Sequence, residues 1–235
     1  MGLNVRRWGA EGGAPFVFWH ALGPDASAEY FGEIAARLGA HGYDVFGIDG
    51  PGFGGSPLLP SPEEYRLASL AALLRGQVDD LGLERPVVAG HSWGGAVAVT
   101  YAATYPDDVR ALVLLDSGHI DYADLAEAEI GKSYEERLAE VVARPDPRNA
   151  EGRAMAMNGM GDRVSPAWAV VAEHHIPTLL LLATEPPHGD QNRRHIHRFE
   201  EAIPHAEVRW VEGATHGIVG TTGPRLGDDL AAWLA

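Results

Sequence analysis

Residues 87–95, Val-Val-Ala-Gly-His-Ser-Trp-Gly-Gly, restrict how the surrounding chain can fold. A short apolar run ends in Gly-x-Ser-x-Gly, and a helical pattern follows at once over residues 94–105. This order predicts a strand, a very tight turn and a helix, with Ser92 at the apex. Gly90 and Gly94 lack side chains where the strand and the helix must nearly touch. Such a turn exposes the Ser92 hydroxyl and directs N–H groups and the positive end of the helix dipole toward it, so Ser92 is a candidate nucleophile.

Strand-like and helical segments alternate on both sides of this turn. We expect strands at 3–8, 16–19, 43–48, 87–89, 111–115, 178–182 and 207–211, and helices at 25–38, 62–81, 94–105, 192–202 and 224–234. The alternation predicts an α/β protein with a mostly parallel sheet of about seven strands and helices on both faces. In such sheets the functional site lies beyond the C-terminal ends of the strands.

Composition argues against several kinds of partner and chemistry. The 235 residues include no cysteine, which excludes disulfides, thiol catalysis and cysteine-bound zinc. A net charge of −15 disfavours nucleic acid and anionic membrane surfaces as partners. No apolar run approaches the ~20 residues of a membrane helix. The first ten residues lack a signal-peptide stretch, so we expect a cytoplasmic protein. Nothing in the sequence distinguishes a monomer from a homodimer.

A serine nucleophile needs a base to take its proton, an acid to orient that base, and an oxyanion hole. Among the 11 histidines, His216 is the best candidate for the base. It lies in the loop 213–217, Gly-Ala-Thr-His-Gly, between the last predicted strand and the last predicted helix. Small residues around it would let the imidazole reach Ser92.

Together, the turn at 90–94, the glycine-rich loop at 49–56 and the late Gly-x-x-His at 213–216 resemble the α/β-hydrolase superfamily. The likeness extends over nearly the whole chain. It implies an α/β-hydrolase fold, with Ser92 as nucleophile and His216 as base, and no cofactor. It also implies a core at 1–117 and 166–235 and an inserted helical lid at 118–165, which is short for a lid.

The acid departs from the family's usual arrangement, which places an aspartate shortly after the next-to-last strand. That position falls here near Pro186, and Glu185 is the carboxylate beside it. Asp116 is a second candidate because it ends the predicted strand 111–115, next to the nucleophile strand. Haloalkane dehalogenases are among the superfamily members that carry their acid at this strand end. We favour Asp116 and keep Glu185 as the alternative.

The resemblance assigns the oxyanion hole to the backbone N–H groups of Leu22 and Trp93. Ala21 stands where relatives usually have glycine, and we expect His20 to hold this loop by hydrogen bonds. We expect an apolar substrate pocket lined by Trp19, His20, Ala21, Phe53, His91 and Met157. Histidines 195 and 197 fall two apart on a predicted helix and so point away from each other, and we expect no metal site.

These features favour a serine hydrolase that cleaves small-molecule carboxylic esters with small to medium apolar acyl groups. One alternative is a C–C bond hydrolase of the meta-cleavage-product type, because the Gly23-Pro24 step followed by Ala26 and Ser27 resembles a loop of those enzymes. A third possibility is a ligand-binding protein without catalysis on the same fold. Hydrolases that use an aspartate nucleophile are disfavoured because Ser92 occupies that position.

Overall fold

The computed structural model describes residues 2–125 and 131–235 of the chain. Its sheet has seven strands in the order β1-β3-β2-β4-β5-β6-β7. The strands are β1 (Val5–Gly9), β2 (Ala14–Trp19), β3 (Tyr43–Ile48), β4 (Val87–His91), β5 (Ala111–Leu115), β6 (Thr178–Ala183) and β7 (Glu207–Val211). β1 pairs antiparallel with β3, and every other pairing is parallel. The predicted α/β fold with a mostly parallel seven-stranded sheet is therefore confirmed.

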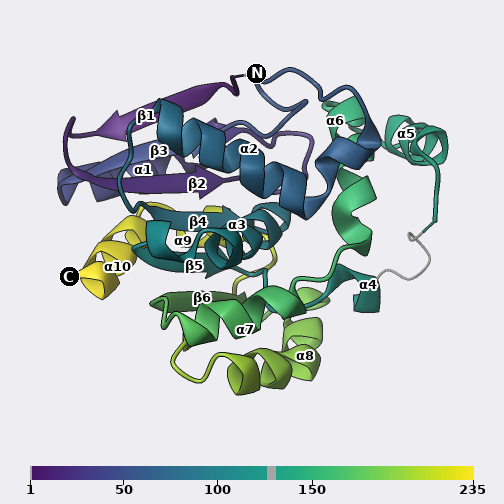
Figure 1. Ribbon diagram of the computed structural model, residues 1–235. Coiled ribbons are helices and arrows are strands. Elements are labelled where there is room, and N and C mark those ends of the chain that lie inside the picture. The colour runs from purple at the N-terminus through teal and green to yellow at the C-terminus, as the bar shows by residue number, and fades with distance from the viewer. Residues whose placement is uncertain (1, 126–130) are drawn as a thin grey trace.

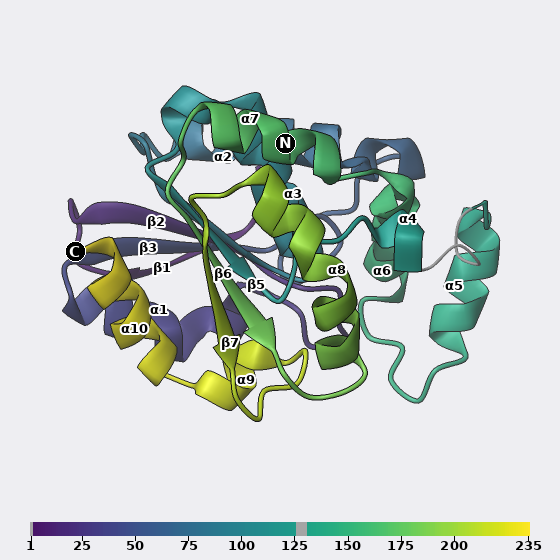
Figure 2. The ribbon, with the colours of Figure 1, turned by 90° about the horizontal axis from the view of Figure 1, so that it is seen from below.

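Helices cover both faces of the sheet, as Figure 2 shows. The described α-helices are α1 (Gly32–Ala40), α2 (Leu67–Asp80), α3 (Trp93–Thr104), α4 (Tyr122–Leu125), α5 (Tyr134–Val142), α6 (Ala150–Ala156), α7 (Ser165–Glu173), α8 (His188–Ala202), α9 (Ile218–Thr222) and α10 (Arg225–Leu234). One core cluster packs α2, α3, α7 and α8 on one face, and a second packs α1, α9 and α10 on the other. β2 shows the strand periodicity that separates them, because Val17 and Trp19 belong to the first cluster while Phe16 and Phe18 belong to the second.

Some element boundaries differ from the predicted ones. The predicted helices 25–38 and 62–81 begin as short 3-10 turns, Ala28–Phe31 and Pro62–Tyr65, before α1 and α2 start. α8 begins at His188, four residues before the predicted start. The sequence prediction missed α7 because its residues are apolar around much of the helix, which hides the helical period.

Helices α4, α5 and α6 lie together at one end of the sheet, beyond the C-terminal ends of the parallel strands (Figure 1). They fall in the predicted lid, of which residues 126–130 lie outside the described part of the chain. The buried carboxylate of Asp121 fixes the base of this segment by accepting N–H groups from Val164 and Ser165 at 2.7 and 2.9 Å. Asn149, just before α6, donates its side-chain N–H to the Pro24 carbonyl at 3.0 Å. The segment is thus tied to the loop that follows β2.

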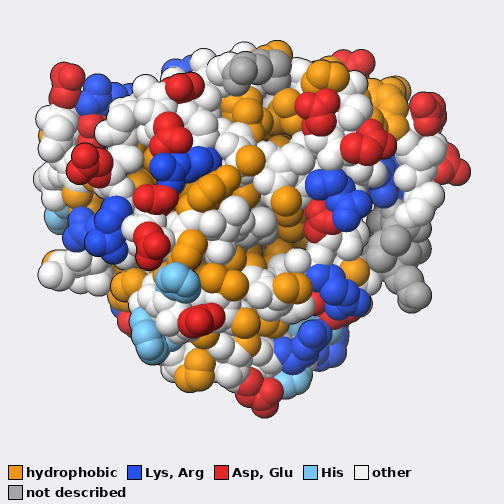
Figure 3. All heavy atoms as spheres, viewed as in Figure 1, with side chains coloured by type: hydrophobic (Ala, Val, Ile, Leu, Met, Phe, Trp, Pro, Cys, Tyr) orange, Lys and Arg blue, Asp and Glu red, His pale blue; other side chains and the backbone are white. Residues whose placement is uncertain are grey.

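On the face shown in Figure 3, acidic and basic side chains are interspersed, with hydrophobic groups between them. Neither sign of charge forms a continuous stripe on this face. Among the described helices, none is both long and apolar enough to cross a bilayer.

Candidate active site

Ser92 lies at the sharp turn between β4 and α3, with φ 55° and ψ −119°. Left-handed backbone of this kind is costly for a residue with a side chain and persists only where the surrounding structure enforces it. Two glycines make the turn possible. A Cβ on Gly90 would overlap the backbone of Gly94, and a Cβ on Gly94 would overlap the carbonyl of Trp19. The helix therefore begins close against the sheet, with the Ser92 side chain at its N-terminus.

His216 lies between Ser92 and Asp116. One of its ring nitrogens contacts Ser92, and the other contacts Asp116. Nε2 lies 2.9 Å from Oγ of Ser92, and Nδ1 lies 2.7 Å from Oδ2 of Asp116. An ionised carboxylate can only accept hydrogen bonds, so Nδ1 carries the proton and donates it to Asp116. Nε2 is then free to accept the Ser92 hydroxyl proton. The arrangement can move a proton from the serine to the histidine.

The Asp116 carboxylate is buried but well supplied with donors. Its Oδ1 accepts the Ala183 N–H at 2.8 Å and the side-chain N–H of Asn192 at 2.6 Å. Burial is the largest single influence on its pKa and favours the neutral acid, but the hydrogen bonds from His216, Ala183 and Asn192 and the His216 charge outweigh it. The pKa of Asp116 is consequently held below its usual value, and the group is a carboxylate at neutral pH.

Glu185, the alternative acid, lies elsewhere. It follows β6 and is exposed, and its backbone N–H donates to the Ala214 carbonyl at 2.9 Å. Within the described part of the chain, its carboxylate makes no hydrogen bond and no ion pair, whereas His216 pairs with Asp116. The structure brings Asp116, and not Glu185, to the histidine.

The loop that carries the predicted oxyanion donor is held by His20. Its ring is buried, accepts the Gly50 N–H on Nε2 at 2.8 Å, and donates from Nδ1 to the Ala21 carbonyl at 2.7 Å. Burial lowers the pKa of His20 to about 4, against the opposing influence of the Ala21 carbonyl, so the ring is neutral. Leu22, two residues on, and Trp93 border the same cavity.

The other residues expected in the substrate pocket have different positions. Trp19 and Phe53 are fully buried and pack against Trp93, with ring centroids 5.6 Å apart in each case. Met157 is half-buried at the start of the 3-10 turn Met157–Gly161. It lines neither the cavity bordered by Leu22 and Trp93 nor the one bordered by His188 and His216.

His91 is also buried, and it contacts the backbone of the base. Its Nε2 donates to the carbonyl of His216 at 2.6 Å, and the ring of Tyr30 stacks on it. Burial, followed by the His216 charge, lowers the pKa of His91 to about 3. This neutral histidine holds the loop that presents His216.

Three residues near the site had no assigned role in the sequence analysis. The Tyr122 hydroxyl lies 3.5 Å from Ser92 Oγ, and the His188 ring stacks on His216 with centroids 4.0 Å apart. Asn192 links Asp116 to His119, whose Nε2 lies 2.9 Å from Asn192 Oδ1. Burial lowers the pKa of His188 below its usual value, with the His216 charge adding to the effect. All three come from α4 or α8. No local sequence pattern predicts that these helices pack over the strand ends.

Asp116, His188 and His216 are the described residues that could supply ligands to a metal ion, since their ligand atoms lie within 4.8 Å of one another. Both ring nitrogens of His216 already have partners, because Nδ1 donates to Asp116 and Nε2 lies 2.9 Å from Ser92 Oγ. An ion bound through either nitrogen would have to break one of these contacts.

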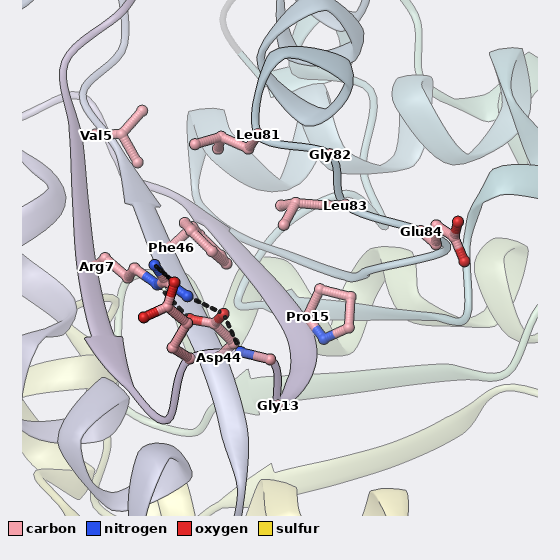
Figure 4. Close-up of a pocket in the computed structure, with 12 residues that line it drawn as sticks. Val5, Arg7, Gly13, Pro15, Asp44, Phe46, Leu81, Gly82, Leu83 and Glu84 are labelled. Atoms are coloured by element: carbon pink, nitrogen blue, oxygen red, sulfur yellow. Dashed lines mark hydrogen bonds and ion pairs between the residues drawn. The ribbon is translucent and has the colours of Figure 1, made fainter.

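A groove of about 760 Å³, larger than either cavity near Ser92 and His216, lies at the end of the sheet opposite these residues (Figure 4). It is bordered by Gly13 and Pro15 at the start of β2 and by Leu83 and Glu84 just before β4. Its arginine, Arg7, is paired with Asp44 at 2.6 Å. Neither a serine nor a histidine lines it, so its size does not make it the site of a serine–histidine pair.

A family model described as alpha/beta hydrolase fold matches residues 14–157. Lipase LipV of Mycobacterium tuberculosis is 37% identical over 169 residues, which cover 70% of this chain and 58% of the lipase. A 2-hydroxy-6-oxononadienedioate/2-hydroxy-6-oxononatrienedioate hydrolase of Paraburkholderia phymatum is 38% identical over 104 residues, covering 43% of this chain and 35% of that protein.

Among solved structures, a carboxylesterase of the Thaumarchaeon Nitrososphaera gargenis superposes with a TM-score of 0.79. The superposition covers 98% of this chain and 93% of the other at 18% identity, and it shows a shared fold. The matches to the first curated relatives span between 35% and 40% of their length.

Proposed function

The chain belongs to the α/β-hydrolase family, and from this premise we propose that it is a serine hydrolase of small-molecule carboxylic esters. Ser92 is the nucleophile, His216 the general base and acid, and Asp116 the acid that orients His216. The observation that carries the proposal is the unbroken chain of contacts from Ser92 Oγ through both nitrogens of His216 to Asp116, at 2.9 and 2.7 Å.

In the first half of the reaction, His216 Nε2 takes the hydroxyl proton as Ser92 Oγ attacks the ester carbon. Asp116 stabilises the positive imidazolium that results. The backbone N–H groups of Leu22 and Trp93 donate to the oxygen that becomes negative. The C–O bond to the alcohol then breaks, and the alcohol leaves with the proton that His216 gives back, so Ser92 is left acylated.

In the second half, water takes the place of the alcohol. His216 removes a proton from the water, the resulting hydroxide attacks the acyl carbon, and Ser92 leaves with the proton returned by His216. The products are a carboxylic acid and an alcohol, and no cofactor enters either half. In this scheme residues 118–165 form a lid over a core made of 1–117 and 166–235.

A C–C bond hydrolase is the second candidate, and the match to the Paraburkholderia phymatum enzyme supports it. Both reactions use a serine and a histidine, so the two differ in substrate and not in the residues named above. The test is to supply p-nitrophenyl acetate and a ring-cleavage dienoate to separate samples and to count product molecules per active site. Many turnovers of the ester alone support the esterase, and many turnovers of the dienoate alone support the alternative. Turnover of neither supports a binding protein.

A further inference from the structure

Two cavities meet at Tyr122, whose hydroxyl lies 3.5 Å from Ser92 Oγ. The first, here called the Leu22 cavity, is bordered mainly by Leu22, Leu67, Trp93, Ala96, Tyr122 and Val164. The second, here called the His188 cavity, is bordered mainly by His119, Tyr122, His188, Gln191, Asn192 and His216. An ester bound to Ser92 has two parts to place, and the two cavities differ in size and chemistry.

The proton transfers decide which part of the ester enters which cavity. The leaving oxygen must receive its proton from His216, and His216 borders only the His188 cavity. The proposed oxyanion donors, Leu22 and Trp93, border the other cavity. With the alcohol directed toward His216, the acyl chain is left with the Leu22 cavity.

The Leu22 cavity is small, at about 20 Å³, which is room for about one water-sized group. One side of it is rigid, because Leu67, Trp93, Ala96 and Val164 are all buried in the protein core. Asp162 also borders it, but its carboxylate already accepts the Leu67 N–H at 2.8 Å and pairs with Arg66. A methyl group fits this space, and longer chains require the walls to move.

The His188 cavity is about ten times larger, at about 210 Å³, and it combines apolar surface with more polar side chains than the Leu22 cavity has. The side chains of His188 and Gln191 lie at its border and are only half-buried, so they are accessible to a bound molecule. Neutral imidazole and amide groups can both donate and accept hydrogen bonds. They suit an uncharged alcohol that carries hydroxyl groups.

Building on the proposed esterase function, we propose that the substrates are acetyl esters of polar, hydroxyl-bearing alcohols. The acetyl methyl occupies the Leu22 cavity, and the alcohol occupies the His188 cavity. Val164 limits the acyl length, and Gln191 contributes to recognition of the alcohol.

The acyl part is tested by kcat/KM for p-nitrophenyl acetate, propionate, butyrate and hexanoate. The native protein should favour acetate over butyrate by at least about tenfold, the scale at which one methylene is discriminated. Val164→Ala should enlarge the cavity and reduce that ratio, whereas Val171→Ala should leave it unchanged. Val171 is a matched control because it is equally buried in the same core cluster but does not border the cavity.

A native preference for butyrate or hexanoate would overturn the acyl assignment while leaving the esterase proposal standing. Equal effects of Val164→Ala and Val171→Ala on the ratio would overturn the role of Val164. Turnover of none of the esters would overturn both the inference and the proposed function.

The alcohol part is tested with glyceryl monoacetate and n-propyl acetate, which share the acyl group and differ in two hydroxyls. Glyceryl monoacetate should be preferred by at least about tenfold in kcat/KM, because unpaired polar groups in the cavity penalise the apolar alcohol. Gln191→Leu should reduce this preference, and His195→Leu, a control on the same helix, should not. Equal rates for the two esters in the native protein would contradict the assignment of the alcohol.

Discussion

Nδ1 of His216 donates to Oδ2 of Asp116 at 2.7 Å, across a separation of 100 residues in the chain. The contact fixes which nitrogen of His216 carries the proton, and therefore which nitrogen faces Ser92. It also joins the end of β5 to the loop after β7, two elements that are not neighbours in the sheet. The proposed catalytic role of Asp116 depends on this contact.

Asp116→Asn should reduce kcat by roughly a thousandfold or more, because an amide cannot hold the required histidine tautomer or stabilise the imidazolium. Glu185→Gln, which also keeps shape and removes charge, should have little effect because Glu185 is exposed and the ion pair of His216 is made with Asp116. Steady-state kinetics with p-nitrophenyl acetate measures both. Inactivation by Glu185→Gln with near-normal turnover of Asp116→Asn would reverse the assignment.

Asn192→Leu should lower kcat by about ten- to hundredfold and leave KM nearly unchanged, because Asp116 loses a hydrogen bond to its charged form. The pKa of Asp116 should rise, since Asn192 is one of the groups that lower it. His195→Leu on the same helix is the control. An effect confined to KM or to stability would show that Asn192 does not act through Asp116.

Substitution by alanine should change the free energy of unfolding in opposite directions at Gly94, in the tight turn, and at Gly76, in α2. Gly94→Ala should cost at least about 2 kcal/mol of unfolding free energy, because the new Cβ overlaps the Trp19 carbonyl. Gly76→Ala should add about 0.5–1 kcal/mol, because nothing lies within 4 Å of the new Cβ and alanine favours the helix. Urea unfolding of both variants measures the difference. A Gly94→Ala protein as stable as the native one would contradict the close approach.

Stability should fall as pH drops from about 6.5 toward 4, because His20 and His91 are neutral when folded. Burial, as the largest influence, lowers their pKa values to about 4 and about 3, whereas an unfolded histidine titrates near 6.5. The unfolded state therefore binds more protons in this window, and each histidine adds up to about 1.4 kcal/mol per pH unit to the slope. His91→Gln should reduce the slope of the unfolding free energy by about half of this contribution. An unchanged slope would contradict a buried neutral His91.

How far the sequence predicts the structure depends on how local the signal is. The turn at Ser92 could be predicted because Gly90 and Gly94 both lie within two residues of it in the chain. Each lacks the side chain that would block the close approach of the strand and the helix. The choice between Asp116 and Glu185 could not be settled, because β5 and β6 are adjacent and both carboxylates follow strands that end at the same edge. Only the three-dimensional path of the loop carrying His216 separates the two.

Residues of α4 and α8 were harder still to foresee. Tyr122 and His188 reach the site because α4 and the start of α8 lie over the strand ends, and that packing depends on contacts far apart in the chain. α7, which the sequence prediction missed, illustrates the same limit, because an apolar helix carries little periodic signal.

The most direct measurement is the steady-state rate of p-nitrophenyl acetate hydrolysis by the native protein, Ser92→Ala, His216→Ala and the double variant. Each single substitution should remove nearly all turnover, and the double variant should be little slower than either, because both residues act in one relay. Unfolding curves check that the variants remain folded. Near-native turnover by folded Ser92→Ala, or losses that multiply in the double variant, would contradict the Ser92–His216 mechanism.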